Sequence, residues 1–218
     1  MKIPFRLSKQ RLEKLRHEFG GNVSGEMGET YRGFPYGFWA FSRTPLTQCL
    51  SKLSEQEEQL AKQVFNTILT YAGLGNNGDV VRRVEEEHVN LLQSIIERCM
   101  HKENLLNEMY LQLVKQTTDH PDPNSRVNLR HWALLSLSCS VVLPHDKAVR
   151  KYLIAHIKKC SSDYVTEEGK YARFADKVSH HRFYAFNSLF LPVSYFKWCE
   201  KMVWEGSIML GWKIDCRS

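Results

Sequence analysis

The sequence predicts an all-α fold, a compact bundle of roughly six helices. Apolar residues recur three and four positions apart in several segments, which is the spacing of one helix face. Glycine and proline separate these segments where a helix has to end. No segment shows the sustained alternation of apolar and polar residues that is typical of strands. The predicted helices cover about residues 54–72, 79–101, 104–118, 126–142, 147–160 and 167–178.

The first two predicted helices are defined by their ends and their apolar faces. Ser54 followed by Glu57 forms a capping box, in which the two residues satisfy each other's free backbone N–H groups. Gly73 is a natural stop for the first helix. The second helix is expected to bury one histidine within its apolar face, which consists of Val84, His88, Leu91, Leu92, Ile95, Ile96 and Cys99.

Proline and aspartate mark the ends of the later helices. The third helix ends before Pro121 and Pro123, because proline cannot continue a helix. The fourth is apolar around nearly its whole circumference, which predicts a central, buried helix. Pro144 breaks the chain again, and Asp146 caps the fifth helix. The sixth is expected to turn the following residues inward: Tyr171, Phe174, Ala175 and Val178.

The composition indicates one folded domain with an extension at each end. The chain has 218 residues, of which 43% are hydrophobic. Residues 1–30 form a basic extension, with a short amphipathic helix expected within 2–19, and a Gly-rich linker; the domain covers 31–179, and 180–218 is an aromatic-rich tail. The N-terminus lacks the apolar stretch of a signal peptide, and no run is long and apolar enough to span a bilayer. Six widely spaced cysteines without a C-x-x-C pair indicate reduced thiols in the cytoplasm.

Motifs with possible chemistry are isolated and lack their usual context. "GLGNNG" (73–78) has the spacing of a dinucleotide-binding loop but follows a predicted helix instead of a strand. "EEEH" contains one Glu-x-x-His, and His88 lies on an apolar face, which favours a core histidine over a metal ligand. "DHPD" (119–122) and "HH" (180–181) do not have the spacing of a defined metal site. We therefore expect a non-catalytic protein without a cofactor or a metal.

A basic face on the fifth predicted helix is the strongest candidate for binding. Lys147, Lys151 and Lys158 lie on one side of the helix, with Arg150 and Lys159 beside them. No acidic residue stands four positions away to neutralise the three lysines, so either a solvated surface or a site for an acidic ligand is possible. The net charge of +6 also favours acidic partners. Four further residues would widen this basic face if their helices pack beside it: Arg126, Arg130, Lys170 and Arg173.

The third predicted helix carries an unusual polar set. It consists of Glu108, Tyr110, Gln112, Lys115 and Gln116. In one interpretation these side chains are buried and hydrogen-bond neighbouring helices and loops, because buried polar groups need hydrogen-bond partners. The other makes them an exposed surface for cargo. We favour the structural interpretation.

Four segments, taken in order, resemble the MyTH4 (myosin tail homology 4) domain over about residues 31–179. The segments are "FWAFSRTPLTQCLSKL" (38–53), "NEMYLQLVKQTTDHPDPNS" (107–125), "HWALLSLSCSVVLPHDKAVRKYLIAHIKK" (131–159) and "EEGKYARFADKV" (167–178). The signature positions that match the family pattern include the polar set together with Trp132, Lys170 and Tyr171.

The resemblance implies a compact helical domain of the tails of unconventional myosins and of pleckstrin-homology–MyTH4–FERM proteins. In that family a FERM domain usually follows, and the pair binds cargo or microtubules. In some members, lysines of the K-Y-L-x-x-H helix contact microtubules, and the matching positions are Lys151 and Lys158. The middle lysine position is Ile154, which predicts weaker binding. The family pattern stops after about His180, so a tail fragment or a short isoform is expected.

These observations together predict a cytoplasmic, cytoskeleton-associated adaptor module. Its basic face would bind microtubules through tubulin tails, or an acidic cargo peptide. One alternative is the structural half of a MyTH4–FERM unit that binds little by itself. Another is recruitment to an anionic membrane through residues 1–19. Nucleic-acid binding is not expected, because aromatic residues do not alternate with the basic ones on an exposed face.

Overall fold

The structure, a computed structural model, describes residues 30–31, 34–35, 38–75, 80–81 and 84–184. Within these residues it contains six helices, and the all-α prediction is confirmed. They are α2 (Glu55–Tyr71), α3 (Glu85–Cys99), α4 (Glu103–Gln116), α5 (Arg126–Val141), α6 (Lys147–Ser161) and α7 (Glu167–Tyr184). Two short strands, β1 (Thr30–Tyr31) and β2 (Phe34–Pro35), form an antiparallel pair ahead of them. The helix expected at 2–19 and the tail beyond α7 lie outside the described residues.

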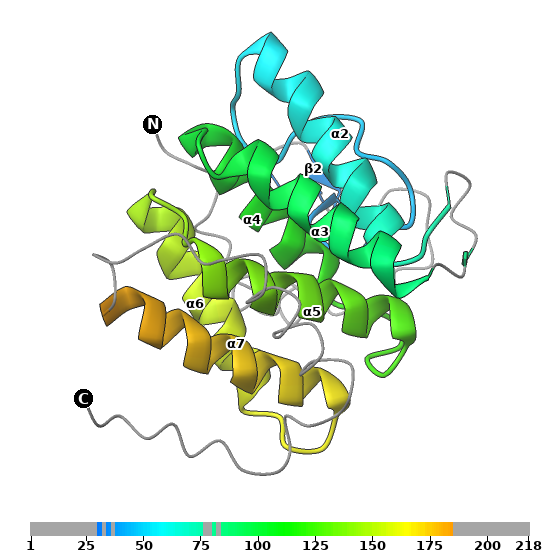
Figure 1. Cartoon of the computed structure of the whole chain (residues 1–218), viewed down its shortest axis with the longest axis vertical. Helices are drawn as coiled ribbons and strands as arrows, with labels where there is room; N and C mark the ends of the chain where they lie inside the picture. The colour runs from blue at the N-terminus through cyan, green and yellow to red at the C-terminus, as the bar shows by residue number, and fades with distance from the viewer. Residues whose placement is uncertain (1–29, 32–33, 36–37, 76–79, 82–83, 185–218) are drawn as a thin grey trace.

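The helices pack around α4 and α5. Figure 1 shows α2 at one end of the bundle and α7 at the other, with α4 and α5 between them. Almost every residue of α5 is buried, as its apolar sequence predicts. Trp132 of α5 and Tyr110 of α4 are among the largest fully buried side chains of the core.

The ends of α2 follow the predicted signals. The Ser54 hydroxyl accepts a hydrogen bond from the Glu57 backbone N–H at 3.4 Å, and the Glu57 carboxylate accepts one from the Ser54 N–H at 3.1 Å. Beyond the helix, Gly73 takes a φ of 86°, a left-handed conformation that strains any residue with a Cβ atom. The capping box and the glycine stop are both confirmed.

The prediction for the start of the second helix is wrong. Helix α3 begins at Glu85, about six residues later than expected, and Val84 is its N-cap residue with 65% of its surface exposed. The reason is a backbone interaction ahead of the helix. Leu74 and Val80 form an isolated antiparallel bridge, and the Val81 N–H donates to the Gly73 carbonyl at 2.6 Å. These bonds keep Val80 and Val81 out of a helix, although the apolar spacing alone suggests one there.

The other helix boundaries lie within two residues of their predicted positions, with one exception. Helix α7 continues to Tyr184 instead of ending near residue 178. No glycine or proline interrupts this part of the sequence, and His180 lies one turn beyond Asp176, with 3.5 Å between Nε2 and Oδ1.

The described cysteines form no disulfide with one another, and most of them are buried. Burial raises the pKa of Cys99 and Cys139 to about 12, so these thiols are protonated at neutral pH. Cys199 and Cys216 lie outside the described residues. Within the part of the chain that the structure describes, no helix combines the length and the apolar character needed to cross a bilayer.

Candidate functional site

The polar set of the third predicted helix lies inside the protein. Every residue of α4 from Leu105 to Gln116 is buried, the five members of the polar set included. These side chains therefore face other parts of the fold instead of solvent, and what they contact shows what they hold together.

Glu108 is the centre of this buried network. Its carboxylate accepts hydrogen bonds from the backbone N–H groups of Leu50 at 2.9 Å and Ser51 at 2.8 Å, and from the Ser51 hydroxyl at 2.5 Å. Gln112 donates to Glu108 at 3.2 Å and to the Ala61 carbonyl of α2 at 3.0 Å. Burial raises the pKa of Glu108, and the four hydrogen bonds act in the opposite direction. The two side chains tie the segment before α2, and α2 itself, to α4.

Lys115 and Gln116 hold the segment that precedes α2. The ammonium group of Lys115 donates to the Ala40 carbonyl, and burial lowers the pKa of this lysine to about 8. Gln116 donates to the Ser42 carbonyl at 2.9 Å and accepts from the Ser42 N–H at 3.1 Å. Residues 38–53 contain no helix of their own beyond a single turn, so these bonds supply backbone partners that regular structure would otherwise provide.

The remaining signature residues also contribute to packing. The Tyr110 hydroxyl donates to the Val142 carbonyl at the end of α5. The Trp132 ring stacks on His156 of α6 with 5.4 Å between ring centroids, and His156 hydrogen-bonds the Thr117 hydroxyl at 2.8 Å. Tyr171 is half-buried against the core, and burial raises the pKa of its hydroxyl.

The basic face of α6 points away from the core. Val149, Leu153 and Ile157 are buried on the opposite side, while Lys147, Lys151, Lys158 and Lys159 are exposed. Asp146 uses its carboxylate as the helix cap, accepting from the Ala148 and Val149 N–H groups at 2.7 and 2.9 Å. Among the described residues no ion pair neutralises Lys147, Lys151 or Lys158.

Two features reduce the strength of the basic face. The guanidinium group of Arg150 is half-buried and donates twice to the Pro144 carbonyl, at 2.9 and 2.7 Å. Ile154 is half-buried on the same side as Lys147, Lys151 and Lys158, where it adds no charge. The charge available to a partner is therefore concentrated on the lysines.

The fold limits how far the basic face extends. Arg130 is only 3% exposed, so the prediction that it could widen the basic face is wrong; its guanidinium group lies inside the fold, close to Gly73. Lys170 forms an ion pair with Glu167, and Arg173 donates to the Asp163 carbonyl. Arg126 at the start of α5 is exposed and remains available.

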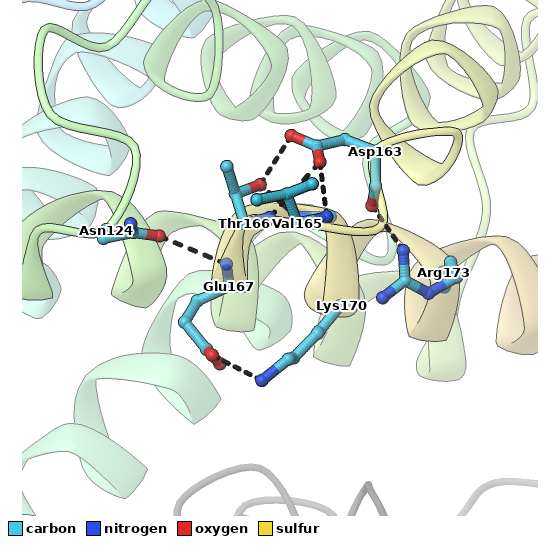
Figure 2. Close-up of polar contacts among 8 residues, drawn as sticks. Asn124, Asp163, Val165, Thr166, Glu167, Lys170 and Arg173 are labelled. Atoms are coloured by element: carbon cyan, nitrogen blue, oxygen red, sulfur yellow. Dashed lines mark hydrogen bonds and ion pairs between the residues drawn. The ribbon is translucent and has the colours of Figure 1, made fainter.

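The loop between α6 and α7 is a feature that the sequence analysis missed. Figure 2 shows the Asp163 carboxylate accepting from the N–H groups of Val165 at 2.8 Å and Thr166 at 3.2 Å, and from the Thr166 hydroxyl at 2.7 Å. Arg173 reaches back from α7 to the same turn, and Asn124 accepts from the Glu167 N–H at 3.1 Å. An Asp followed three residues later by Thr, just ahead of a helix, is the signal that could have indicated this turn.

Gly169 lets this loop close against α7. A Cβ atom at this position would lie 1.9 Å from the Asp163 carbonyl oxygen, a distance that only movement of the backbone could relieve. We expect Gly169→Ala to lower the free energy of unfolding by about 2–3 kcal/mol, measured by urea denaturation. Lys177→Ala, at an exposed position of the same helix, is the control and should change it by less than about 0.5 kcal/mol. An unchanged transition for Gly169→Ala would contradict the prediction.

The isolated motifs occupy structural positions. "GLGNNG" begins after α2 and leads towards α3, so its described part lies between two helices. His88 is buried with its ring edge-on to Tyr71 at 5.5 Å. His120 accepts from the Asp122 N–H at 3.1 Å within the turn after α4. Among the described residues no three His, Cys, Asp or Glu side chains come together as metal ligands.

Comparisons with known proteins identify the fold. Residues 92–185 match the family model of the MyTH4 domain. A kinesin-like protein, KIN-14E of Arabidopsis thaliana, is 24% identical over 127 residues, which are 58% of this chain and 10% of that protein. The MyTH4-FERM MF1 domain of Dictyostelium discoideum myosin VII aligns with 92% of this chain and 40% of its own, with a TM-score of 0.63 and 17% identity.

A human structure is similar as well. The C-terminal MyTH4-FERM domain of myosin 7b, solved in complex with the harmonin-a PDZ3 domain, aligns with 86% of this chain and 36% of its own, at a TM-score of 0.59 and 20% identity. The chain thus spans less than half the length of each of these relatives.

Proposed function

We propose that this chain is a MyTH4 module, a protein-binding unit of cytoskeletal motor tails, and that its basic face binds an acidic segment of a cytoskeletal protein partner. Tubulin tails and acidic cargo peptides are the partners with the required charge. The observation that carries the proposal is the arrangement of Lys147, Lys151 and Lys158 on the outward side of α6, without ion pairs among the described residues. Like charges on one helix face repel each other, and an acidic ligand relieves that repulsion.

The position of the polar set supports this assignment. Glu108, Gln112, Lys115 and Gln116 are occupied inside the fold, so they offer no surface to cargo. The exposed charge that remains on α6 is basic, and α6 itself contains no acidic residue. The relatives include a kinesin-like protein and myosins, which is consistent with a partner on the cytoskeleton.

Charge reversal on the basic face tests the proposal. We expect Lys151→Glu/Lys158→Glu to weaken co-sedimentation with microtubules at least tenfold, because two favourable contacts become repulsive. Lys52→Glu/Lys102→Glu, which reverses two exposed lysines outside α6, is the matched control and should leave binding within about twofold of the original. Binding by the original chain should also fall as the salt concentration is raised from about 50 to about 300 mM, because this shortens the Debye length from about 14 to about 6 Å and screens the charges.

Two further experiments test the acidic partner and the position of the site. Microtubules stripped of their acidic tails by limited proteolysis should lose binding if the tails are the ligand. Ile154→Lys should strengthen binding severalfold, since it fills the uncharged position between Lys151 and Lys158. Unchanged binding by the Lys151→Glu/Lys158→Glu chain would reject the basic face as the site.

The second candidate function is a positioning role beside a FERM domain. The solved relatives carry a MyTH4 and a FERM domain in one chain, and this observation favours it. In that case the isolated chain binds neither microtubules nor acidic peptides, and binding is recovered when a FERM domain is joined to it. The measurement is the same co-sedimentation with and without the joined domain.

A further inference from the structure

The loop between α6 and α7 exposes two adjacent large hydrophobic side chains. Tyr164 is 77% exposed and Val165 is 91% exposed. Val80, Val81 and Val84, the other exposed large hydrophobic residues of the described chain, all belong to the segment that leads into α3. An exposed Tyr–Val pair at the end of the helix that carries the basic face is therefore a local feature of this loop.

The loop is held in one conformation by its own polar contacts. The Asp163 carboxylate accepts from the backbone N–H groups of Val165 and Thr166 (Figure 2). The Gly169 N–H donates to the Thr166 hydroxyl at 3.1 Å. The Arg173 guanidinium lies 4.6 Å from the centre of the Tyr164 ring and also donates to the Asp163 carbonyl. Apolar side chains on a pre-organised loop lose little conformational entropy when a partner covers them.

The charges around the loop select the kind of partner. Its acidic groups are engaged within the fold: Asp163 in the turn, Glu167 with Lys170, and Glu168 accepting from Asn128 at 2.8 Å. Lys158 in the last turn of α6 and Arg126 at the start of α5 are exposed, and neither has an ion pair among the described residues. Arg126 lies close to this loop in the fold, because Asn124, two residues before it, accepts a hydrogen bond from the N–H of Glu167, the first residue of α7. These carboxylates keep their negative charge in such contacts. The basic side chains around the loop still outnumber the acidic ones by one, five against four: Arg126, Lys158, Lys159, Lys170 and Arg173 against Asp122, Asp163, Glu167 and Glu168.

We propose that Tyr164 and Val165 form an apolar anchor that continues the basic face of α6, and that the partner is an acidic polypeptide segment carrying a large apolar side chain. This inference rests on the proposed function and narrows it. The lysines of α6 would attract the acidic residues, while the apolar residue of the partner packs on Val165 and the Tyr164 ring. Covering one exposed valine corresponds to about a tenfold gain in affinity.

A selection from random peptides tests the anchor without a known ligand. The whole chain is used to select twelve-residue peptides from a displayed library, and the affinity of the selected peptides is measured by fluorescence anisotropy. We expect them to combine several acidic residues with one large apolar residue. Val165→Ser should weaken their binding about tenfold, and Val84→Ser, at an exposed valine ahead of α3, should leave it unchanged. Replacing the apolar residue of the peptide by serine should weaken binding by the same factor. It should cause no further loss of affinity when the chain already carries Val165→Ser.

The outcomes separate this inference from the proposed function. If Lys151→Glu/Lys158→Glu abolishes peptide binding but Val165→Ser does not change it, or if the selected peptides are acidic without an apolar residue, the anchor is rejected and the basic face stands. If Val165→Ser weakens binding while charge reversal has no effect, the acidic partner is rejected together with the proposed function. Failure to select any acidic peptide rejects both. Binding to phosphatidylserine vesicles that depends on Val165, with no peptide selected, would identify the surface as a membrane contact and overturn the inference.

Discussion

Replacing Glu108 by alanine is expected to lower the free energy of unfolding by about 4 kcal/mol, as measured by urea denaturation. The carboxylate accepts four hydrogen bonds, from Leu50, Ser51 and Gln112. The alanine variant leaves the buried Leu50 N–H and the Gln112 amide without this partner and opens a cavity between α4 and the segment ahead of α2. Residues 38–53 should become accessible to proteases in the same variant.

Two variants check that the loss comes from the acceptor. Glu108→Gln keeps the size of the side chain but presents an NH₂ group to donors, so it should still cost about 2 kcal/mol. Glu97→Ala, at an exposed position of α3, should change the free energy of unfolding by less than about 0.5 kcal/mol. A Glu108→Ala chain as stable as the original would show that the network does not hold the entry segment.

The second large effect is a loss of stability in acid that depends on His131. This side chain is fully buried beside Phe41, with 6.0 Å between ring centroids, and neither ring nitrogen has a hydrogen-bond partner among the described residues. Burial lowers the pKa of His131 from 6.5 to about 3, and the neighbouring His120 acts in the same direction. In the unfolded chain His131 is therefore protonated below about pH 6.5, whereas in the folded chain it is protonated only below about pH 3.

Because the unfolded chain binds this proton more tightly, the free energy of unfolding decreases as the pH falls below 6.5. Above pH 6.5 the histidine is neutral in both states and contributes nothing to the pH dependence. At pH 4.5 its contribution amounts to a loss of about 3 kcal/mol relative to pH 7.5. His131→Phe should remove this part of the acid sensitivity while leaving stability at pH 7.5 within about 1 kcal/mol, because the ring it replaces makes no hydrogen bond among the described residues.

Urea denaturation at several pH values between 4.5 and 7.5 measures the difference between the two chains. Carboxylate titration affects both chains alike, so it cancels in the comparison. His101→Gln, at an exposed position, is the matched control and should retain the acid sensitivity of the original chain. Equal slopes of stability against pH for His131→Phe and the original chain would contradict the account. If phenylalanine does not fit the site, His131→Leu provides the same comparison without the larger ring.

Local signals predicted the elements well where the determining contacts are close in sequence. The capping box at Ser54, the stop at Gly73 and the Asp146 cap are all interactions within a few residues, and the structure contains each of them. The start of α3 was misplaced because the Leu74–Val80 bridge, a contact across a loop, overrides the apolar spacing near Val84. The same limit explains Arg130, whose burial depends on how α5 packs and not on its immediate neighbours.

The sequence likewise predicted only part of the candidate site, the part that depends on local helical spacing. Periodicity placed the lysines of the basic face on one side of a helix, and the structure describes that side as exposed. Periodicity gave no indication that Lys170 and Arg173 would be engaged by Glu167 and Asp163 instead of joining the basic face. It also did not single out Tyr164 and Val165, because a loop has no period from which exposure can be inferred.

The sequence by itself determined the helical class, the approximate extent of six helices and the outward direction of the lysines on α6, because these follow from the helical repeat and from capping within one turn. Only the tertiary structure decided that Glu108, Lys115 and Gln116 bond the segment ahead of α2, and that the loop after α6 projects a tyrosine and a valine. Those contacts join residues as far as 75 positions apart. Their partners are set by the packing of the whole bundle, which no local pattern encodes.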